Sequence, residues 1–319
     1  MTIRETAEFL RGHDRYLILT HRRPDGDTLG CAAALCALLR ANGKEAGVLP
    51  NPEVSDRYLP VIAPYYAAPE APYDTVVSVD IAALGLFPKG AEDLRDQVDL
   101  AIDHHPSYEQ FGKKSLVDAS AAACGEIVCA LAEEFGALTR EVALPLYIAV
   151  STDTGCFVYS NVTEQTHIVA AKLIATGIDF RSANKLYFRT KSKKRLELEN
   201  ALYGGMKFYD DGRIVVLKFP LSLANTLQLN ESDAEDIAGL GGVIEGTDCS
   251  VMMRESDEGW KVSLRCGARV NATLACSYLG GGGHRAASGC MIRTHDAEAA
   301  EKMILDAIAR AIKEEAENA

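Results

Sequence analysis

Four short apolar runs in the first half of the chain each end abruptly at aspartate or histidine. The runs are residues 17–20, 76–79, 98–102 and 148–152, and the residues that follow them are His21, Asp80, Asp103 and Asp153. Short apolar runs of this kind are typical of buried strands. Four such runs, each closed by a potential metal ligand, predict one site assembled from distant segments of the chain.

The same half of the chain alternates strand-like and helix-like segments. The strand-like segments are residues 16–20, 46–49, 75–80 and 98–103. The helix-like segments are residues 28–42, 119–135 and 139–150. Such alternation predicts an α/β fold with a parallel sheet covered by helices on both faces. Ligands of these sheets bind beyond the carboxyl ends of the strands, where the acidic residues lie.

The pattern changes after Gly212. Before it, residues 163–176 and 180–187 are helix-like, and a basic stretch at 189–195 leads into another helix-like segment. After it, strands are expected at 213–219, 249–254 and 260–265, with a terminal helix at 297–315. This predicts a smaller C-terminal α+β domain. We expect an N-terminal domain of residues 1–187, a linker of residues 188–212 and a second domain of residues 213–319.

Composition narrows the class of protein. The chain has 319 residues, of which 48% are hydrophobic, enough for two packed domains. No apolar run reaches the roughly 18 residues of a membrane span. The nine cysteines are scattered without a Cys-x-x-Cys pair, which indicates a reduced, cytoplasmic chain. A net charge of −12 argues against binding long duplex nucleic acid, although a small phosphate-bearing substrate remains compatible with it.

Carboxylates and imidazoles near the strand ends form a candidate metal site. Asp25 and Asp27 lie two positions apart in a tight Pro-Asp-Gly-Asp turn, so their side chains can reach two neighbouring ions. Asp80, the histidines at 104–105 and Asp153 come from other segments. Mixed carboxylate and imidazole ligands suit Mn²⁺, with Mg²⁺ as a less suitable substitute. Zinc stays open, but no set of thiolates supports it.

A charge count favours phosphate chemistry at this site. Four aspartates balance two divalent ions, so a phosphate ester would need further cations. The second half of the chain offers Arg265, His284 and Arg285. Two ions roughly 3.5–4 Å apart can share a hydroxide and hold the phosphate oxygens during in-line attack.

Four consecutive glycines, residues 280–283, precede His284 and Arg285. Because glycine loses much conformational entropy on folding, such a run is expected where the backbone approaches a ligand closely. A helix beginning at Ala286 would direct main-chain amides at an anion. The alternative is a simple flexible turn.

These motifs together resemble the DHH phosphoesterase family. Its four motifs are similar to residues 21–30 (HRRPDGDTLG), Asp80, residues 103–105 (DHH) and residues 153–155 (DTG). The second half is similar to the DHHA1 domain through residues 262–265, Asn271 and residues 280–289. The resemblance covers nearly the whole chain and is greatest to the bacterial NrnA type. That subfamily is the oligoribonuclease and phosphatase of pAp (3′-phosphoadenosine 5′-phosphate).

The resemblance implies a role for each matched residue. One Mn²⁺ would be held by His21, Asp25 and Asp80, and the other by Asp27, Asp80, His104 and Asp153. Asp80 would thus bridge the ions, and it would act in catalysis with His105, which would contact the scissile phosphate. Asp103 would orient the histidines. The implied substrate contacts in the DHHA1 domain are Arg265, Asn271, Gly282, Gly283 and His284, of which Arg265 and His284 would reach across an interdomain cleft.

Three positions depart from the family pattern. Cys31 and Cys266 stand where serine is common, and Val158 stands where arginine is frequent. No metal ligand is lost, so the departures bear on substrate range more than on catalysis.

We therefore expect a Mn²⁺-dependent hydrolase of short oligoribonucleotides, pAp or both, in which metal-activated hydroxide attacks phosphorus. The main alternative is a phosphodiesterase of a cyclic or linear dinucleotide such as c-di-AMP or pApA. An inorganic pyrophosphatase and a non-catalytic nucleotide sensor are weaker alternatives. The expected partners are short oligonucleotides or nucleotides, without a membrane, and the family makes a homodimer conceivable.

Overall fold

The computed structural model describes residues 1–234 and 236–318. The chain forms two compact units, Met1–Thr190 and Lys191–Ala319. The second domain expected at 213–319 thus includes two positions, 235 and 319, that lie outside the described residues.

The first unit contains a parallel sheet of five strands in the order β2-β1-β3-β4-β5. Four of these strands were expected, with ends within two residues of those observed, and β5 was missed. Their bounds are β1 Tyr16–Leu19, β2 Ala46–Val48, β3 Thr75–Val79, β4 Val98–Asp103 and β5 Lys114–Val117. Because all five strands run in one direction, the residues that follow β1, β3 and β4 meet at one edge of the sheet.

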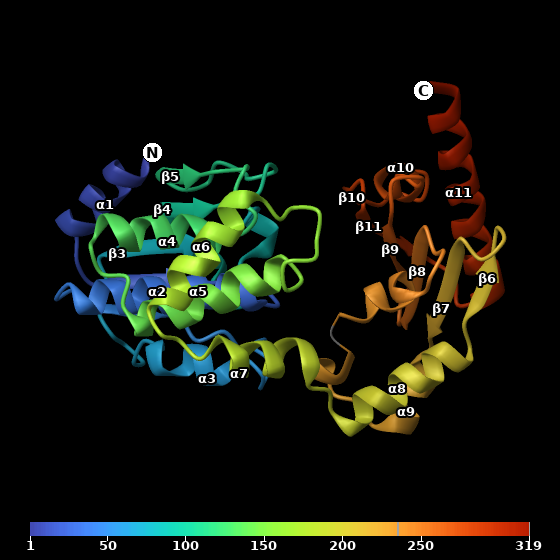
Figure 1. The fold of residues 1–319 in the computed structure, drawn as a ribbon, viewed down its shortest axis with the longest axis horizontal. Coiled ribbons are helices and arrows are strands. Elements are labelled where there is room, and N and C mark those ends of the chain that lie inside the picture. The colour runs from blue at the N-terminus through green and yellow to red at the C-terminus, as the bar shows by residue number, and fades with distance from the viewer. Residues whose placement is uncertain (235, 319) are drawn as a thin grey trace. The chain divides into compact units, whose positions relative to one another are not determined.

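The α-helices of this unit pack together with one face of the sheet (Figure 1). They are α1 Ile3–Gly12, α2 Gly26–Ala41, α3 Leu59–Ile62, α4 Cys124–Glu134, α5 Arg140–Asp153, α6 Glu164–Ala175 and α7 Phe180–Asn184. The helix α7 continues as a π-helix, Lys185–Arg189. Helix α2 lies at the centre of this layer, and its residues 26–39 are all buried. A side chain at Gly30 would meet the Pro145 carbonyl of α5 at 2.4 Å, so glycine there permits the close packing of α2 and α5.

The opposite face of the sheet is covered by loops and 3₁₀ turns. Phe87, Leu94 and Phe111 pack there against strand residues such as Leu19 and Val98. The expectation of helices on both faces is therefore wrong. The reason is that β3 and β4 are connected by two short 3₁₀ turns, Leu84–Leu86 and Glu92–Gln97, and not by an α-helix.

Residues 139–150 were expected to be a helix, which α5 confirms, whereas the strand end expected at 148–152 is wrong. This apolar run forms the last turns of α5, and Asp153 is the final residue of that helix. Helix α5 packs between α2 and α6, so almost all of its residues from Val142 to Ser151 are buried. A helix that is apolar on every side shows no amphipathic period, and a short stretch of it cannot be distinguished from a buried strand.

The second unit is built on a mixed six-stranded sheet in the order β10-β11-β9-β8-β7-β6. The strands are β6 Lys207–Tyr209, β7 Ile214–Phe219, β8 Cys249–Ser256, β9 Gly259–Cys266, β10 Gly282–His284 and β11 Ala287–Ile292. Among the described strands of this second sheet, only β7 and β8 pair in parallel. One face packs on α10 Ala272–Ser277 and α11 Ala297–Asn318, and the other on α8 Lys193–Gly204, α9 Leu221–Leu227 and a 3₁₀ turn, Ile237–Val243.

The glycine-rich segment forms a β-hairpin. The helix expected from Ala286 is absent from the described residues, because Ala287–Ile292 is the strand β11 and pairs antiparallel with β10. Glycine is required by close packing within the hairpin. A side chain at Gly281 would meet the Gly289 carbonyl at 2.2 Å, and Gly283 has a φ of +141°.

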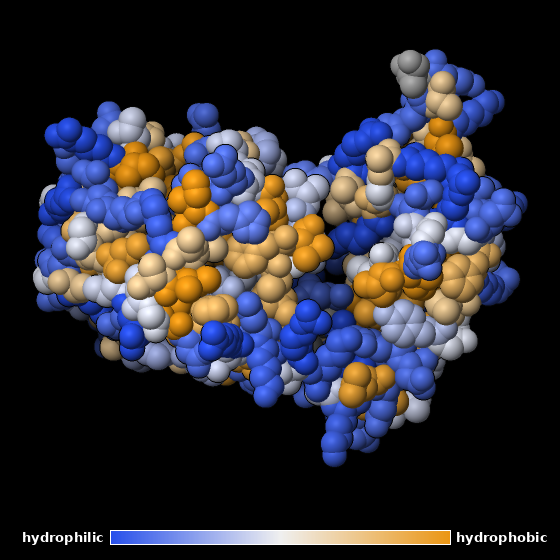
Figure 2. All heavy atoms as spheres, viewed as in Figure 1, coloured by the Kyte–Doolittle hydropathy of each residue, from blue (hydrophilic) through white to orange (hydrophobic). Residues whose placement is uncertain are grey.

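The visible surface is mostly polar, with apolar residues scattered between charged ones (Figure 2). In the part of the chain that the structure describes, no helix combines the length and the hydrophobicity needed to cross a membrane.

Candidate metal centre

The edge at the carboxyl ends of β1, β3 and β4 gathers the histidines and aspartates that the sequence singled out. Among the described residues, three groups have ligand atoms within 4.8 Å of one another. The groups are His21–Asp25–Asp80, Asp27–His104–Asp153 and Asp80–His104–His105. All six residues predicted as metal ligands belong to these groups, and Asp80 joins two of them.

Asp80 lies between the histidines of the other two strand ends. Its Oδ2 is 3.7 Å from Nε2 of His21, and its Oδ1 is 3.6 Å from Nε2 of His104. The two oxygens of one carboxylate therefore face two different ligand sets. Oδ1 is buried and has no hydrogen-bond partner among the described residues, which is costly for a carboxylate unless a cation is present.

The imidazoles are held by their Nδ1 atoms. His21 Nδ1 lies 2.9 Å from the Arg22 carbonyl, and His104 Nδ1 lies 3.1 Å from the Ala121 carbonyl. These contacts engage Nδ1 of both rings, so Nε2 is the atom that faces the carboxylates and is available to a metal. Histidines that bind metals are usually fixed in this way.

His105 is held differently, by the carboxylate of Asp103. Nδ1 of His105 lies 2.9 Å from Oδ1 of Asp103, and 3.5 Å from Oδ1 of Asp80. Burial lowers the pKa of His105, but the hydrogen bond and charge of Asp103 outweigh it and raise the pKa above its usual value. Asp103 therefore orients His105, while His104 is oriented by the main chain.

Asp25 and Asp27 differ in their surroundings although they are two residues apart. Asp25 is the N-cap of α2 and accepts from the amides of Asp27 and Thr28 at 3.0 and 3.2 Å. Asp27 is buried, and its oxygens accept from the amides of Cys124 and Gly125 at 2.7 and 3.0 Å. The first turn of α4 thus fixes the Asp27 carboxylate.

Asp153 reaches the site from the end of α5. Its Oδ2 is 3.7 Å from Nε2 of His104. A helix C-terminus carries a partial negative charge, so the end of α5 adds to the attraction of this edge for cations.

The pKa values show that the site lacks positive charge. Burial and the nearby carboxylates raise the pKa of Asp27 to about 6 and that of Asp153 to about 7, and raise the pKa of Asp80 well above its usual value. Burial also raises the pKa of Asp25, but the charge of His21 and the hydrogen bonds to this carboxylate outweigh it, giving about 2. Divalent cations would relieve this repulsion, so the donor set fits two such ions.

Some contributors were not foreseen from the sequence. They are the amides of Cys124 and Gly125, the Ala121 carbonyl and the thiol of Cys31, which donates to Oδ1 of Asp27 at 3.2 Å. Three of the four are main-chain groups, which have no side-chain signature in a sequence.

Apart from His105, the residues predicted to bind substrate lie in the second unit. His284 on β10 pairs with Ala287 on β11, which pairs with Arg265 on β9. Directly paired residues of an antiparallel sheet point to the same face, and two strand spacings are about 10 Å. Both side chains are exposed, so an arginine and a histidine flank a small alanine on one face.

The next row on this face is made of small residues. Gly282 pairs with Gly289, which pairs with Ser263. The sheet face beside Arg265 and His284 therefore carries only small side chains, and much of it is main chain. Gly283 belongs to the alternate row, and points to the opposite face.

Two other candidates have partners within the unit. Asn271 is the N-cap of α10 through its Oδ1, and its Nδ2 donates to Glu315 at 2.9 Å. Both ends of its amide are thus engaged within the unit, and its contact with substrate stays a prediction. Arg285 is paired with the same Glu315, so its charge is compensated.

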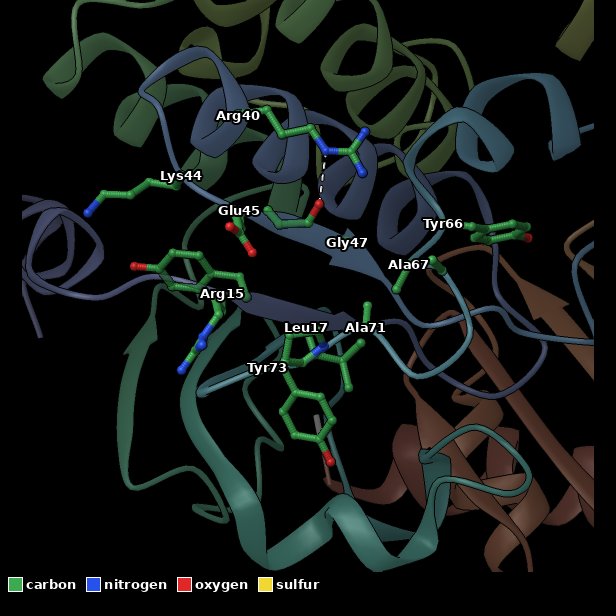
Figure 3. A pocket seen from close by; sticks show the side chains of 14 residues that line it. Arg15, Leu17, Arg40, Lys44, Glu45, Gly47, Tyr66, Ala67, Ala71 and Tyr73 are labelled. Carbon is green, nitrogen blue, oxygen red and sulfur yellow. Dashed lines mark hydrogen bonds between the residues drawn. The ribbon is translucent and has the colours of Figure 1, made fainter.

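A cavity of about 360 Å³ lies at the amino ends of β1 and β2, at the opposite edge of the sheet (Figure 3). Arg40 there donates to the Ala46 carbonyl at 2.9 Å, and Arg15 is paired with Asp74. These cations are held by protein groups, and the cavity is separate from the metal centre.

Comparison with known proteins agrees with this architecture. The chain matches the model of the DHH family N-terminal domain over residues 15–150 and that of the DHHA1 domain over residues 213–314. It is 32% identical to the bifunctional oligoribonuclease and PAP phosphatase NrnA of Thermus thermophilus, over 96% of this chain and 93% of that protein. Identity to the Bacillus subtilis protein of the same name is 28%, over 89% and 91%. An exopolyphosphatase-related protein from Bacteroides fragilis has a similar fold, with a TM-score of 0.86, 23% identity and coverage of 97% and 95%.

Proposed function

Because the chain belongs to the DHH family, with a DHH and a DHHA1 domain, we propose that it is a Mn²⁺-dependent phosphoesterase that hydrolyses short oligoribonucleotides, pAp or both. The observation that carries the proposal is the position of Asp80. One buried carboxylate with an unpartnered oxygen faces two sets of ligands in the described residues, which is the arrangement that a bridged pair of ions requires.

In this proposal the two ions share Asp80 and otherwise have separate ligands. His21, Asp25 and Asp80 would hold the first, and Asp27, Asp80, His104 and Asp153 the second. Mn²⁺ suits these mixed oxygen and nitrogen donors, and Mg²⁺ would be the substitute. When bound, the ions would supply an activated water and stabilise the charge that develops on the phosphoryl oxygens.

His105 would contact the scissile phosphate. Its Nδ1 is engaged by Asp103, so a proton on Nε2 would be available to a phosphate oxygen. The raised pKa of His105 favours the charged ring, which is a stronger donor to an anion.

The DHHA1 domain would bind the rest of the substrate. Arg265 would supply a cation and His284 a further side-chain contact to the phosphate ester, and the row of small residues between them would leave space for a base or ribose. The expected domains are residues 1–187 and 213–319, and α8 and β6, within the expected linker of residues 188–212, pack with the second unit. We also propose a cytoplasmic enzyme that forms a homodimer.

The rival activity is hydrolysis of a cyclic or linear dinucleotide at the same site. The oligoribonuclease and pAp phosphatase reading is favoured because the relatives that align over nearly the whole chain have those activities in their names. A non-catalytic nucleotide sensor would not need two sets of metal ligands that share one carboxylate.

The proposal is tested by steady-state kinetics on pAp, pApA, c-di-AMP, a pentaribonucleotide and inorganic pyrophosphate, after chelation and after return of Mn²⁺. We expect turnover of pAp or of the short RNAs that depends on Mn²⁺. The proposal fails if pyrophosphate or c-di-AMP is the substrate with the highest kcat/KM, or if chelation leaves the rate unchanged.

A further inference from the structure

We propose that Cys249 and Cys266 form a reversible disulfide by exchange with an oxidised small thiol, and that this bond stiffens the part of the sheet that carries Arg265 and His284. Cys249 begins β8 and Cys266 ends β9, and the two are direct cross-strand partners. Their Sγ atoms are 2.9 Å apart. Formation of this disulfide does not depend on which substrate the enzyme hydrolyses.

The register of the two strands favours the bond. The Gly267 amide donates to the Asp248 carbonyl at 2.7 Å, so the pair 248–267 is hydrogen-bonded and the next pair, 249–266, is not. Cα atoms of such a non-hydrogen-bonded pair are about 4.5 Å apart, within the range that disulfides span. A bond of about 2.05 Å then requires the sulfurs to approach by less than about 1 Å.

The two thiols have different roles in the exchange. Cys266 is half-exposed, whereas Cys249 is buried, and the hydrogen bond to Cys266 together with burial raises the pKa of Cys249 far above its usual value. Cys266 is therefore the attacking thiol. Its thiolate attacks one sulfur of glutathione disulfide, which releases one glutathione thiolate and leaves a mixed disulfide. The sulfur of Cys249 then attacks Sγ of Cys266, releases the second glutathione and gives its proton to solvent.

The Cys249–Cys266 disulfide would act through the backbone of β9 on the sheet face that carries Arg265 and His284, which we call the substrate face. The Cys266 amide donates to the Ala286 carbonyl at 2.8 Å, in the turn between β10 and β11. Arg265 precedes Cys266 and pairs with Ala287, the partner of His284. A covalent link from β8 to Cys266 therefore anchors the strand end to which the glycine-rich hairpin is attached.

Other cysteines of the chain serve as internal controls for the oxidation experiment. Cys276 on α10 and Cys290 on β11 are a second pair of neighbouring thiols, but both are buried in the core of the unit. Cys156 in the first unit is half-exposed, so its modification reports access of the oxidant. Arg254, Lys261 and Arg265 lie between Cys249 and Cys266, so trypsin separates the two cysteines into different peptides.

The test treats the full-length protein with glutathione disulfide, traps free thiols by alkylation and maps tryptic peptides without reduction by mass spectrometry. We expect the Cys249 and Cys266 peptides to be joined, and dithiothreitol to separate them. Amide hydrogen exchange of residues 262–290 should slow by about 3-fold or more in the oxidised protein. The Cys266→Ser variant, treated in the same way, should show neither change.

Three results would overturn the proposal. The first is glutathionylation of Cys156 while Cys249 and Cys266 both remain alkylatable. The second is a bond from either cysteine to Cys276 or Cys290. The third is a Cys249–Cys266 bond that leaves hydrogen exchange of the hairpin unchanged.

Discussion

Asp103 holds His105 through two hydrogen bonds to a single carboxylate oxygen. Oδ1 of Asp103 accepts from the main-chain amide of His105 at 2.6 Å and lies 2.9 Å from its Nδ1. Asp103 is fully buried, and its other oxygen has no partner among the described residues. The orientation and charge of one imidazole thus depend on the residue two positions earlier.

This pair gives the first prediction. Asp103→Asn preserves shape but removes the charge that supports the imidazolium, so kcat should fall by about 10- to 100-fold while the protein still binds two Mn²⁺ ions. Metal analysis and kinetics on one preparation measure both quantities. Loss of metal in proportion to activity would mean that Asp103 supports the ligands and not His105.

The second prediction concerns the bridge. Asp80→Ala removes a ligand from both sets, so the purified variant should bind less Mn²⁺ than Asp25→Ala, which removes a ligand from one set. Metal content after dialysis measures the difference, with Asp96→Ala, an exposed aspartate remote from the centre, as the control. Equal and full occupancy in Asp80→Ala and Asp25→Ala would contradict the bridging role.

The third prediction concerns pH. Raised carboxylate pKa values in the folded protein mean that protons stabilise the metal-free fold, and this stabilisation is lost as pH rises through about 6 for Asp27 and about 7 for Asp153. The pKa of Asp25 is lowered to about 2, so its contribution does not change in this range. The increase in Tm on addition of Mn²⁺ should therefore be larger at pH 8 than at pH 5.5. Thermal unfolding at both pH values with and without Mn²⁺ tests this, and an equal increase would count against the carboxylates as ligands.

The fourth prediction concerns the substrate face. Arg265→Ala and His284→Ala should each retain Mn²⁺ and the fold, but lose roughly 1.5–3 kcal/mol of binding to phosphate, or about 10- to 150-fold in kcat/KM. Lys261→Ala is the matched control, because it removes an exposed cation from the same face of β9. If either point variant keeps wild-type kcat/KM on both pAp and a dinucleotide, the substrate is bound elsewhere.

The fifth prediction concerns substrate length. An acidic chain with a net charge of −12 should bind long RNA poorly, so the rate should fall steeply beyond a few nucleotides. Turnover of a diribonucleotide and a 24-mer of the same base, at fixed ionic strength, gives the comparison. Similar rates on both would show that the substrate site is open at both ends.

The strand ends were predictable because polarity changes there within a single residue. β4 matches its expected bounds, since an apolar strand is followed at once by Asp103 and His104. The sequence could not show that Asp153 ends a helix, because α5 is buried on nearly all sides and has no polar face. Nor could it show β10, since a run of glycines has no strand propensity and pairs only where a partner strand is already in place.

Side-chain identity also says little about what a polar residue contacts. The sequence did not show that the amide of Asn271 caps α10 and donates to Glu315. Asp27 was expected at the site, but the amides of Cys124 and Gly125 that fix it come from a helix almost a hundred residues later. Such partners follow from the tertiary fold alone.

The backbone at Asp80 has a φ of +58°, in the left-handed region that favours glycine over residues with a side chain. Together with the unpartnered carboxylate oxygen, this makes Asp80 a source of instability in the metal-free fold. Replacement of Asp80 by glycine would remove both the unfavourable backbone conformation and the unpartnered buried oxygen. A lineage no longer selected for catalysis could therefore become more thermostable by losing this one residue, and a search for stabilised variants by heat alone would tend to recover inactive protein.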